Sequence, residues 1–224
     1  WYSGSCFDNV KSVRESYPDT LLLPSEACFE LTNTNVNDDN ADESDWLTKG
    51  IWSKGEGYGY DILGDLESGS NGWTDWNILL DQTGGPNHVG NYCDAPIIAD
   101  VSSTNSDDFE LYYHPQYWYL GHFSKFLPKG SYRLKSLTSG ISLNPTSDWS
   151  EDQCEASYGG CDGDHLHTTA FRNQDDQKIV VIVMNCGSDD KYMSLTIGEG
   201  DGDENGGGVL ENNVPAHSIQ TYII

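Results

Sequence analysis

The spacing of hydrophobic positions predicts alternating helices and strands over the first part of the chain. Apolar residues recur at near-helical intervals from Phe7 to Tyr17, and Pro18 ends that run. Further along we expect a short apolar strand at 20–23, a glycine-containing helix around 58–66, a strand at 72–80, a short apolar run at 97–101 and an aromatic helix over 115–126. Helices that alternate with strands are typical of a βα-barrel or a doubly wound sheet.

The pattern changes after the Pro-Lys-Gly sequence at 128–130, where helical spacing gives way to short strands. These strands are expected at 132–139, 165–172, 178–185, 192–197 and 217–224. Turn-rich loops separate them, and a hairpin at 173–177 should join the second to the third. Such a series is typical of an antiparallel β-sandwich. The sequence therefore predicts two domains, residues 1–130 and residues 131–224.

The charge of the chain limits its partners. There are 36 Asp and Glu residues against 11 Lys and Arg residues, which gives a net charge of −25. A surface of this sign repels nucleic acid and anionic membranes, because phosphate binding needs clustered Lys and Arg. No apolar run approaches the roughly 18 residues of a membrane-spanning helix. We therefore expect no nucleic-acid partner.

One carboxylate stands where an apolar strand should end. The strand at 20–23 runs through Pro24 and Ser25 into Glu26, and catalytic groups of βα-barrels lie at the carboxyl ends of strands. Trp76 lies near the end of the next expected strand. A carboxylate beside an exposed aromatic ring can hold a sugar, because the ring covers its apolar face while the acid acts at the anomeric carbon. The alternatives are a solvated loop acid and a core tryptophan.

The six cysteines and the histidines leave further alternatives open. Cys154 and Cys161 flank a short acidic loop, so they form either a local disulfide or two free thiols. The remaining cysteines show no obvious partners. His165 and His167 alternate on an expected strand and share one face, but a third metal ligand is missing. We therefore predict no metal site and no cofactor.

Three stretches carry a resemblance to a known family. They are "LLLPSEACFE", "GWTDWNILLDQTGGPNHVGNYCDAPIIAD" and "YHPQYWYLGHFSKFLPKGSYR", and they resemble the C-terminal half of glucosylceramidases in glycoside hydrolase family 30. The resemblance implies an α/β part followed by an all-β part. Residues 1–130 would form the C-terminal strands and helices of a (β/α)8 TIM-barrel catalytic domain. Residues 131–224 would form an antiparallel β-sandwich domain.

The resemblance also implies roles for particular residues. The family nucleophile, the Glu of a Ser-Glu-Ala-Cys segment, matches Glu26, and Cys28 lies in the same segment. Tyr2 matches a tyrosine that contacts the nucleophile, and Trp76 matches the tryptophan that walls the glucose site. Asn91 and Tyr92 match positions in the loop over the pocket; they join Tyr2, Cys28 and Trp76 as expected substrate-binding residues.

One expected residue is absent from the sequence. Retaining glycosidases need a second carboxylate as acid/base, and the family supplies it from an Asn-Glu-Pro segment that these residues lack. We therefore expect the chain to be the C-terminal part of a larger enzyme, inactive without the missing N-terminal part of the barrel.

The resemblance implies a retaining β-glucosidase that hydrolyses glucosylceramide to glucose and ceramide. It would be lysosomal, vacuolar or secreted, with a lipid-presenting activator protein as a further partner. One alternative keeps the family but makes the substrate a β-1,6-glucan or another β-glucoside. The alternative from another class is a non-catalytic fragment or binding module.

Overall fold

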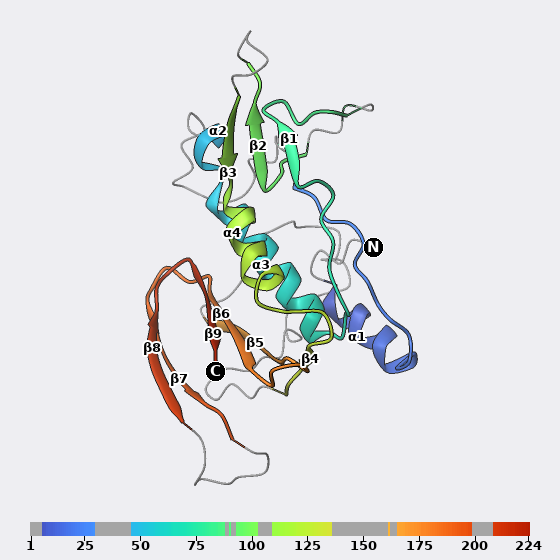
Figure 1. Cartoon of the computed structure of the whole chain (residues 1–224), viewed down its shortest axis with the longest axis vertical. Coiled ribbons are helices and arrows are strands. Elements are labelled where there is room, and N and C mark those ends of the chain that lie inside the picture. Colours follow the sequence, from blue (N-terminus) through green and yellow to red (C-terminus); the bar gives the residue numbers. More distant parts are fainter. Residues whose placement is uncertain are drawn as a thin grey trace.

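The computed structural model describes residues 6–29, 46–87, 90, 93–102, 109–135, 161, 165–198 and 208–224. The helices of this part are α1 (Phe7–Ser16), α2 (Trp46–Lys49), α3 (Trp52–Glu67) and α4 (Pro115–Ser124). Its strands are β1 (Leu79–Asp81), β2 (Ile97–Asp100), β3 (Glu110–Tyr113), β4 (Tyr132–Arg133), β5 (Leu166–Arg172), β6 (Ile179–Asn185), β7 (Lys191–Thr196), β8 (Val209–Val214) and β9 (Ser218–Ile223). Figure 1 shows α3 and α4 crossing the middle of the molecule, between the β1–β3 sheet and the other sheets.

Helices α3 and α4 pack closely because glycines on α3 leave room for side chains of α4. A Cβ atom at Gly55 would lie 2.6 Å from Pro115 Cβ, and one at Gly59 would lie 2.6 Å from Tyr119 Cδ1. Atoms this close cannot coexist without a shift of one helix. Glycine at these two positions therefore sets the distance between the helices.

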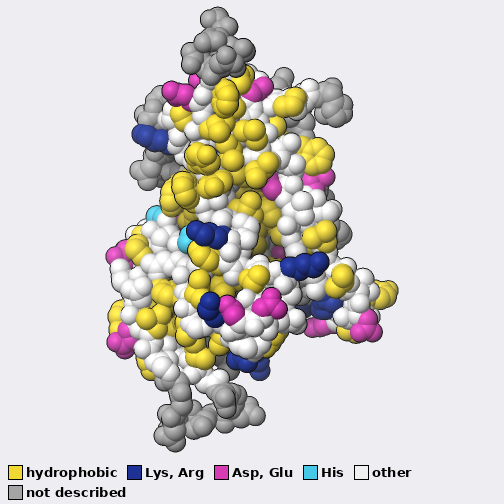
Figure 2. Space-filling view, viewed as in Figure 1, with side chains coloured by type: hydrophobic (Ala, Val, Ile, Leu, Met, Phe, Trp, Pro, Cys, Tyr) yellow, Lys and Arg dark blue, Asp and Glu magenta, His cyan; other side chains and the backbone are white. Residues whose placement is uncertain are grey.

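The first of the sheets combines two strand directions. β1 pairs with β2 in parallel, and β2 pairs with β3 in antiparallel orientation. Figure 2 shows hydrophobic side chains gathered on the surface over this sheet. Exposed apolar residues of this part include Ile78, Leu79 and Leu111.

The four-stranded sheet β4-β5-β6-β9 is antiparallel throughout and forms the centre of the second part. On β6, Val180 and Ile182 join a core cluster with residues of α3 and α4. The intervening Val181 and Val183 join another cluster with residues of the β7–β8 pair. β6 is therefore buried on both faces, which explains its uninterrupted apolar sequence.

Polar contacts connect α3 to the sandwich at both ends of the helix. Near its start, the indole Nε1–H of Trp52 donates to the carbonyl of His217 at 3.0 Å, and His217 Nδ1 lies 3.0 Å from Glu56 Oε1. At its end, Glu67 accepts from Thr169 at 2.6 Å and from Arg133 at 2.9 Å. These bonds fix the helix against β4, β5 and the turn before β9.

The structure confirms most elements predicted from the sequence. The three expected helices correspond to α1, α3 and α4, and the hairpin at 173–177 joins β5 to β6. The regular strand at 20–23 is wrong, since no strand is assigned there, and the strand at 72–80 is confined to β1. Strands β3 and β8 were not predicted. The domain boundary near Gly130 stays a prediction; it falls in the turn between α4 and β4.

Among the described residues, no helix is both long and apolar enough to cross a membrane. This agrees with the absence of a long apolar run in the sequence.

Candidate active site

The candidate nucleophile lies on a segment that runs beside the one carrying Trp76. Backbone N–H groups of the second segment donate to carbonyls of the first: Asn71 to Leu22 at 2.8 Å, Thr74 to Pro24 at 3.0 Å, and Trp76 to Ala27 at 2.9 Å. The numbers rise together, so the two segments are parallel. They take the place of the two regular strands that the sequence predicted.

Arg14 of α1 fixes the start of this pair of segments. Its guanidinium donates to the carbonyls of Pro18 and Thr20 at 2.9 and 2.8 Å, and to the carbonyl of Gly69 at 2.9 Å. It also donates to the side chain of Asn71, which accepts from the backbone of Leu22. One side chain thus holds both segments where they begin to run together.

The bond between Trp76 and Ala27 brings the two principal candidates together. Ala27 follows Glu26 directly. The hydrogen bond therefore brings the backbone of Trp76 next to the residue that follows Glu26. Trp76 is 52% exposed, which rules out the alternative of a core tryptophan. Glu26 is half-buried. An exposed indole beside a carboxylate is suited to a sugar ring.

Asp75 lies beneath Trp76 and connects it to α3. One oxygen of Asp75 accepts from the hydroxyl of Tyr58 at 2.6 Å and from the backbone N–H of Trp76 at 2.8 Å. Burial raises the pKa of Asp75 from 3.8 to about 6, although these two hydrogen bonds act in the opposite direction. Trp73 is fixed in a similar way, because its indole N–H donates to Asp61 at 2.8 Å.

A second buried carboxylate, Asp94, is surrounded by donors. One oxygen accepts from Lys54 and from Gln116, both at 3.0 Å, and the other accepts from the backbone of Ala95 at 2.8 Å. His114 Nδ1 lies 3.0 Å from the same second oxygen. Burial alone would raise the pKa of Asp94, but the bond to His114 and the charge of Lys54 lower it to about 2.

The ring of His114 is enclosed by acceptors. Its Nε2 lies 2.9 Å from the carbonyl oxygen of Leu47, and its Nδ1 faces the Asp94 carboxylate. The ring is therefore held between the Asp94 carboxylate and the backbone that follows α2's first residue.

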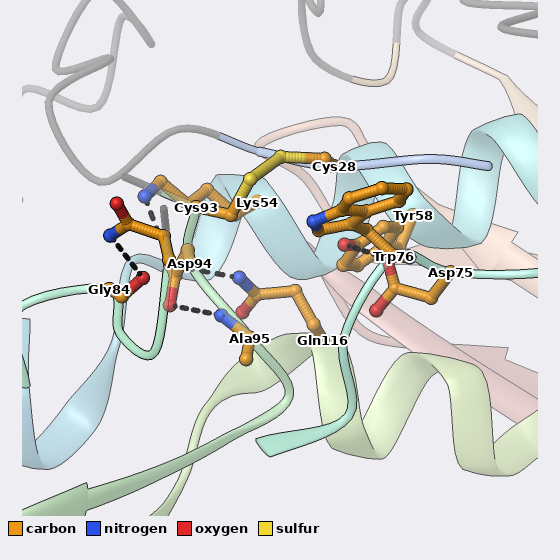
Figure 3. Close-up of a disulfide and its surroundings, with 11 residues drawn as sticks. Cys28, Lys54, Tyr58, Asp75, Trp76, Gly84, Cys93, Asp94, Ala95 and Gln116 are labelled. Carbon is orange, nitrogen blue, oxygen red and sulfur yellow. Dashed lines mark hydrogen bonds and ion pairs between the residues drawn. A yellow bond between two sulfur atoms is a disulfide. The ribbon is translucent and has the colours of Figure 1, made fainter. Parts of the chain in front are cut away.

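A disulfide joins Cys28 to Cys93 (Figure 3). Cys28 is two residues past Glu26, and Cys93 directly precedes Asp94. No partner for either cysteine was evident from the sequence. Because Cys28 is in a disulfide, it has no thiol to offer a substrate. This bond was missed because the two cysteines are 65 residues apart.

The second disulfide corrects the expected pairing of Cys161. It is bonded to Cys186, so the predicted local bridge between Cys154 and Cys161 is wrong, and so is the alternative of a free thiol at Cys161. Cys154 itself lies outside the described residues. Cys161, Cys186 and His167 have ligand atoms within 4.8 Å of one another, but sulfurs joined in a disulfide are not thiolate ligands.

Three of the predicted site residues cannot be placed. Tyr2, Asn91 and Tyr92 lie outside the described residues. In contrast, the structure brings Glu26, Cys28 and Trp76 together. Sequence reasoning missed the Asp94 cluster, because its members are dispersed over 63 residues and become neighbours only through the packing of α3 and α4.

Comparison with known proteins identifies the family. The sequence pattern described as "Glycosyl hydrolase family 30 TIM-barrel domain" matches residues 1–127, more than half of the chain. The chain belongs to glycosyl hydrolase family 30. The family's β-sandwich domain matches residues 154–222. The predicted family and fold class, a TIM-barrel portion followed by a β-sandwich, are therefore confirmed.

The similarity to a known protein extends over most of the chain. The mouse protein "Lysosomal acid glucosylceramidase" is 35% identical over 207 residues, which cover 92% of this chain and 32% of that protein. This family 30 chain therefore spans about a third of the length of that relative.

Two solved structures share the fold of this family 30 chain. SrfJ from Salmonella typhimurium superposes with a TM-score of 0.68 at 24% identity, covering 100% of this chain and 39% of that protein. The endo-β1,6-glucanase BT3312 superposes with a TM-score of 0.64 at 18% identity, covering 97% of this chain and 38% of that protein.

Proposed function

We propose that this chain is the nucleophile-bearing part of a retaining β-glucosidase that hydrolyses glucosylceramide. The observation that supports the proposal is the 2.9 Å bond from the Trp76 N–H to the carbonyl of Ala27, the residue after Glu26, together with the exposure of the Trp76 side chain. Family membership and the relationship to a mouse protein named as a glucosylceramidase support it.

In the proposed reaction, Glu26 attacks the anomeric carbon and forms a covalent glycosyl-enzyme intermediate. Trp76 stacks on the glucose ring and orients it, and Tyr2, Asn91 and Tyr92 complete the binding site. A second carboxylate protonates the leaving oxygen and then activates the water that releases glucose. This chain lacks the Asn-Glu-Pro segment that would carry it, so the upstream part of the barrel supplies it.

The same proposal implies a cellular setting. A glycolipid substrate requires access to a membrane surface, and the net charge of −25 disfavours direct adsorption to anionic lipid at neutral pH. A lipid-presenting activator protein would meet that need. An acidic compartment such as the lysosome or vacuole, or secretion, agrees with the disulfides Cys28–Cys93 and Cys161–Cys186.

The nucleophile is tested by labelling the full-length protein with a mechanism-based cyclitol epoxide and mapping the modified peptide. We expect the label on Glu26 and none in the Glu26→Gln variant. Label on another carboxylate in the wild-type protein would remove Glu26 from this role. Turnover of glucosylceramide compared with β-1,6-linked glucan separates the two substrates. Activity confined to the glucan would replace the lipid with the alternative substrate.

The third interpretation, a non-catalytic binding module, predicts a different result. A full-length protein that binds a β-glucoside but neither hydrolyses it nor reacts with the epoxide would favour the module.

A further inference from the structure

The backbone around Glu26 is held from two sides. On one side, the carbonyl of Ala27 accepts from the Trp76 N–H at 2.9 Å. On the other, the carbonyl of Phe29 accepts from the Asp94 N–H at 2.6 Å. Cys28 lies between Ala27 and Phe29, and its disulfide to Cys93 joins the Glu26 segment covalently to the segment of Asp94. The residues that follow Glu26 therefore cannot move independently of residues 93–94.

Asp94 makes that second side rigid. Its carboxylate is almost completely buried and accepts from Lys54 on α3 and from Gln116 on α4. A shift of Cys93 would pull this carboxylate from its donors, and a buried charge without partners is costly. The disulfide thus connects the Glu26 segment to an anchor that both helices hold in place. Figure 3 shows Cys93 and Asp94 leading from the disulfide to Gln116.

The core also holds Cys93 in place. Cys93 is 1% exposed and packs with Leu80, Ala95 and Ile98, so its position is fixed by the core beneath it.

We propose that Cys28 and Cys93 are positioning residues, and that their disulfide holds the segment of Glu26 in place for glycosyl transfer. This inference rests on the proposed function of Glu26. It makes turnover dependent on the redox state of one bond. A small dithiol breaks the Sγ–Sγ bond, each cysteine gains a hydrogen, and the dithiol becomes its own cyclic disulfide. Loss of the bond frees both segments, and small displacements of a nucleophile reduce rates by about 100-fold.

The test compares two double variants of the full-length protein. C28S/C93S removes the proposed positioning bond, and C161S/C186S removes the disulfide of the sandwich, which is the matched control. For C28S/C93S we expect kcat/KM on an activated aryl β-glucoside and the rate of epoxide labelling to fall by about 10- to 100-fold. The control should keep wild-type rates. Both variants should show a lower melting temperature, because each lost a crosslink.

A second measurement uses the wild-type protein, so that the inference can be tested even if C28S/C93S does not fold. The folded wild-type protein is titrated with dithiothreitol, and its activity, circular dichroism and free thiols are followed together. We expect activity to fall with the release of the Cys28 and Cys93 thiols while the circular dichroism stays native, and reoxidation should restore it. The control variant should respond to the reductant as the wild-type protein does.

The outcomes separate this inference from the proposed function. If the oxidised wild-type protein is not labelled on Glu26, the proposed function fails. If Glu26 is labelled but reduction or C28S/C93S leaves the labelling rate unchanged, the positioning role is overturned and the proposed function stands. An equal loss of rate in both double variants would also overturn it, because the effect would then be one of general stability.

Discussion

Two buried aspartates near the candidate site carry opposite pKa shifts, and the difference follows from their neighbours. Asp94 faces Lys54 and His114, which lower its pKa to about 2 despite its burial. Asp75 has only a hydroxyl and a backbone N–H as donors, so burial dominates and raises its pKa to about 6. The first carboxyl stays ionised in mild acid, whereas the second becomes neutral there.

Asp75 should make the protein more stable in mild acid. Its pKa is about two units higher in the folded than in the unfolded chain, so the folded state binds more protons between about pH 4 and 6. This contribution is present in full below about pH 4 and is lost as the pH rises through about 6; it amounts to about 3 kcal/mol. Asp75→Asn should flatten the dependence of the melting temperature on pH over this range.

Tyr58→Phe should change the pH dependence of the melting temperature in the opposite direction to Asp75→Asn. It removes a hydroxyl that lowers the pKa of Asp75, so the dependence on pH should become steeper. A thermal shift series from pH 4 to 7 measures both variants. An Asp75→Asn profile parallel to that of the wild-type protein would contradict the expected ionisation of Asp75.

The Asp94 carboxylate should limit stability at lower pH. Its pKa is depressed from 3.8 to about 2, so its contribution is present above about pH 4 and is lost as the pH falls through about 2. Asp94→Asn should therefore lower the melting temperature most at pH 5 and above, and least near pH 2. If Asp94→Asn lowered the melting temperature equally at every pH, the charge of Asp94 would contribute nothing to stability.

At the residue scale, sequence reasoning found the candidates but not their connections. Glu26 and Trp76 were predicted to lie together from their places at the ends of two strands, and a backbone hydrogen bond joins their segments. The pairing of Cys28 with Cys93 was not predictable, because periodicity and loop length say nothing about contacts between distant residues. For the same reason the expected pairing of Cys161 was wrong.

At the scale of elements, the contact between α3 and α4 gives a prediction with a control inside the same helix pair. A Cβ at Gly55 would lie 2.6 Å from Pro115 Cβ and 2.9 Å from the Pro115 backbone, whereas one at Gly121 meets nothing within 4 Å. Gly55→Ala should therefore lower stability by about 1–3 kcal/mol. Gly121→Ala should be neutral or raise it by up to about 1 kcal/mol, because alanine favours helix.

Thermal unfolding of the two variants beside the wild-type protein measures the difference. Equal melting temperatures for Gly55→Ala and Gly121→Ala would mean that the helices separate at little cost.

Helices and strands whose apolar residues follow a clear pattern were predictable from the sequence, and those without such a pattern were not. β6 has an unbroken apolar run because both faces are buried, and α1 shows near-helical spacing. β8 was missed because its sequence, "VLENNV", has three polar residues in succession and no alternation of polar and apolar residues, and because most of it is exposed. The strand expected at 20–23 was wrong because its backbone bonds to residues 71–76 are too irregular for a ladder.

At the scale of the whole molecule, the isolated chain should be inactive and poorly soluble. The segment that leads to Glu26 exposes Leu21 by 79% and Leu23 by 56%, and the neighbouring segment exposes Ile78 by 66%. Apolar surface of this extent on adjacent segments favours aggregation. Expression of residues 1–224 alone, followed by an assay with glucosylceramide, tests both properties.

Supplying the upstream part of the barrel, as a longer chain or as a separate polypeptide, should restore solubility and turnover together. Efficient hydrolysis of glucosylceramide by residues 1–224 alone would mean that a second carboxylate is present in this chain.

Helix α3 takes its contacts with the sandwich and with the candidate site from different residues. Trp52 and Glu56 meet the turn at His217, whereas Lys54, between them in the sequence, meets Asp94. A substitution at His217 should therefore loosen the start of α3, and with it the position of Lys54 against Asp94, although no residue of the candidate site is changed. The second part of the chain therefore supports the candidate site indirectly, through the helix that carries Lys54.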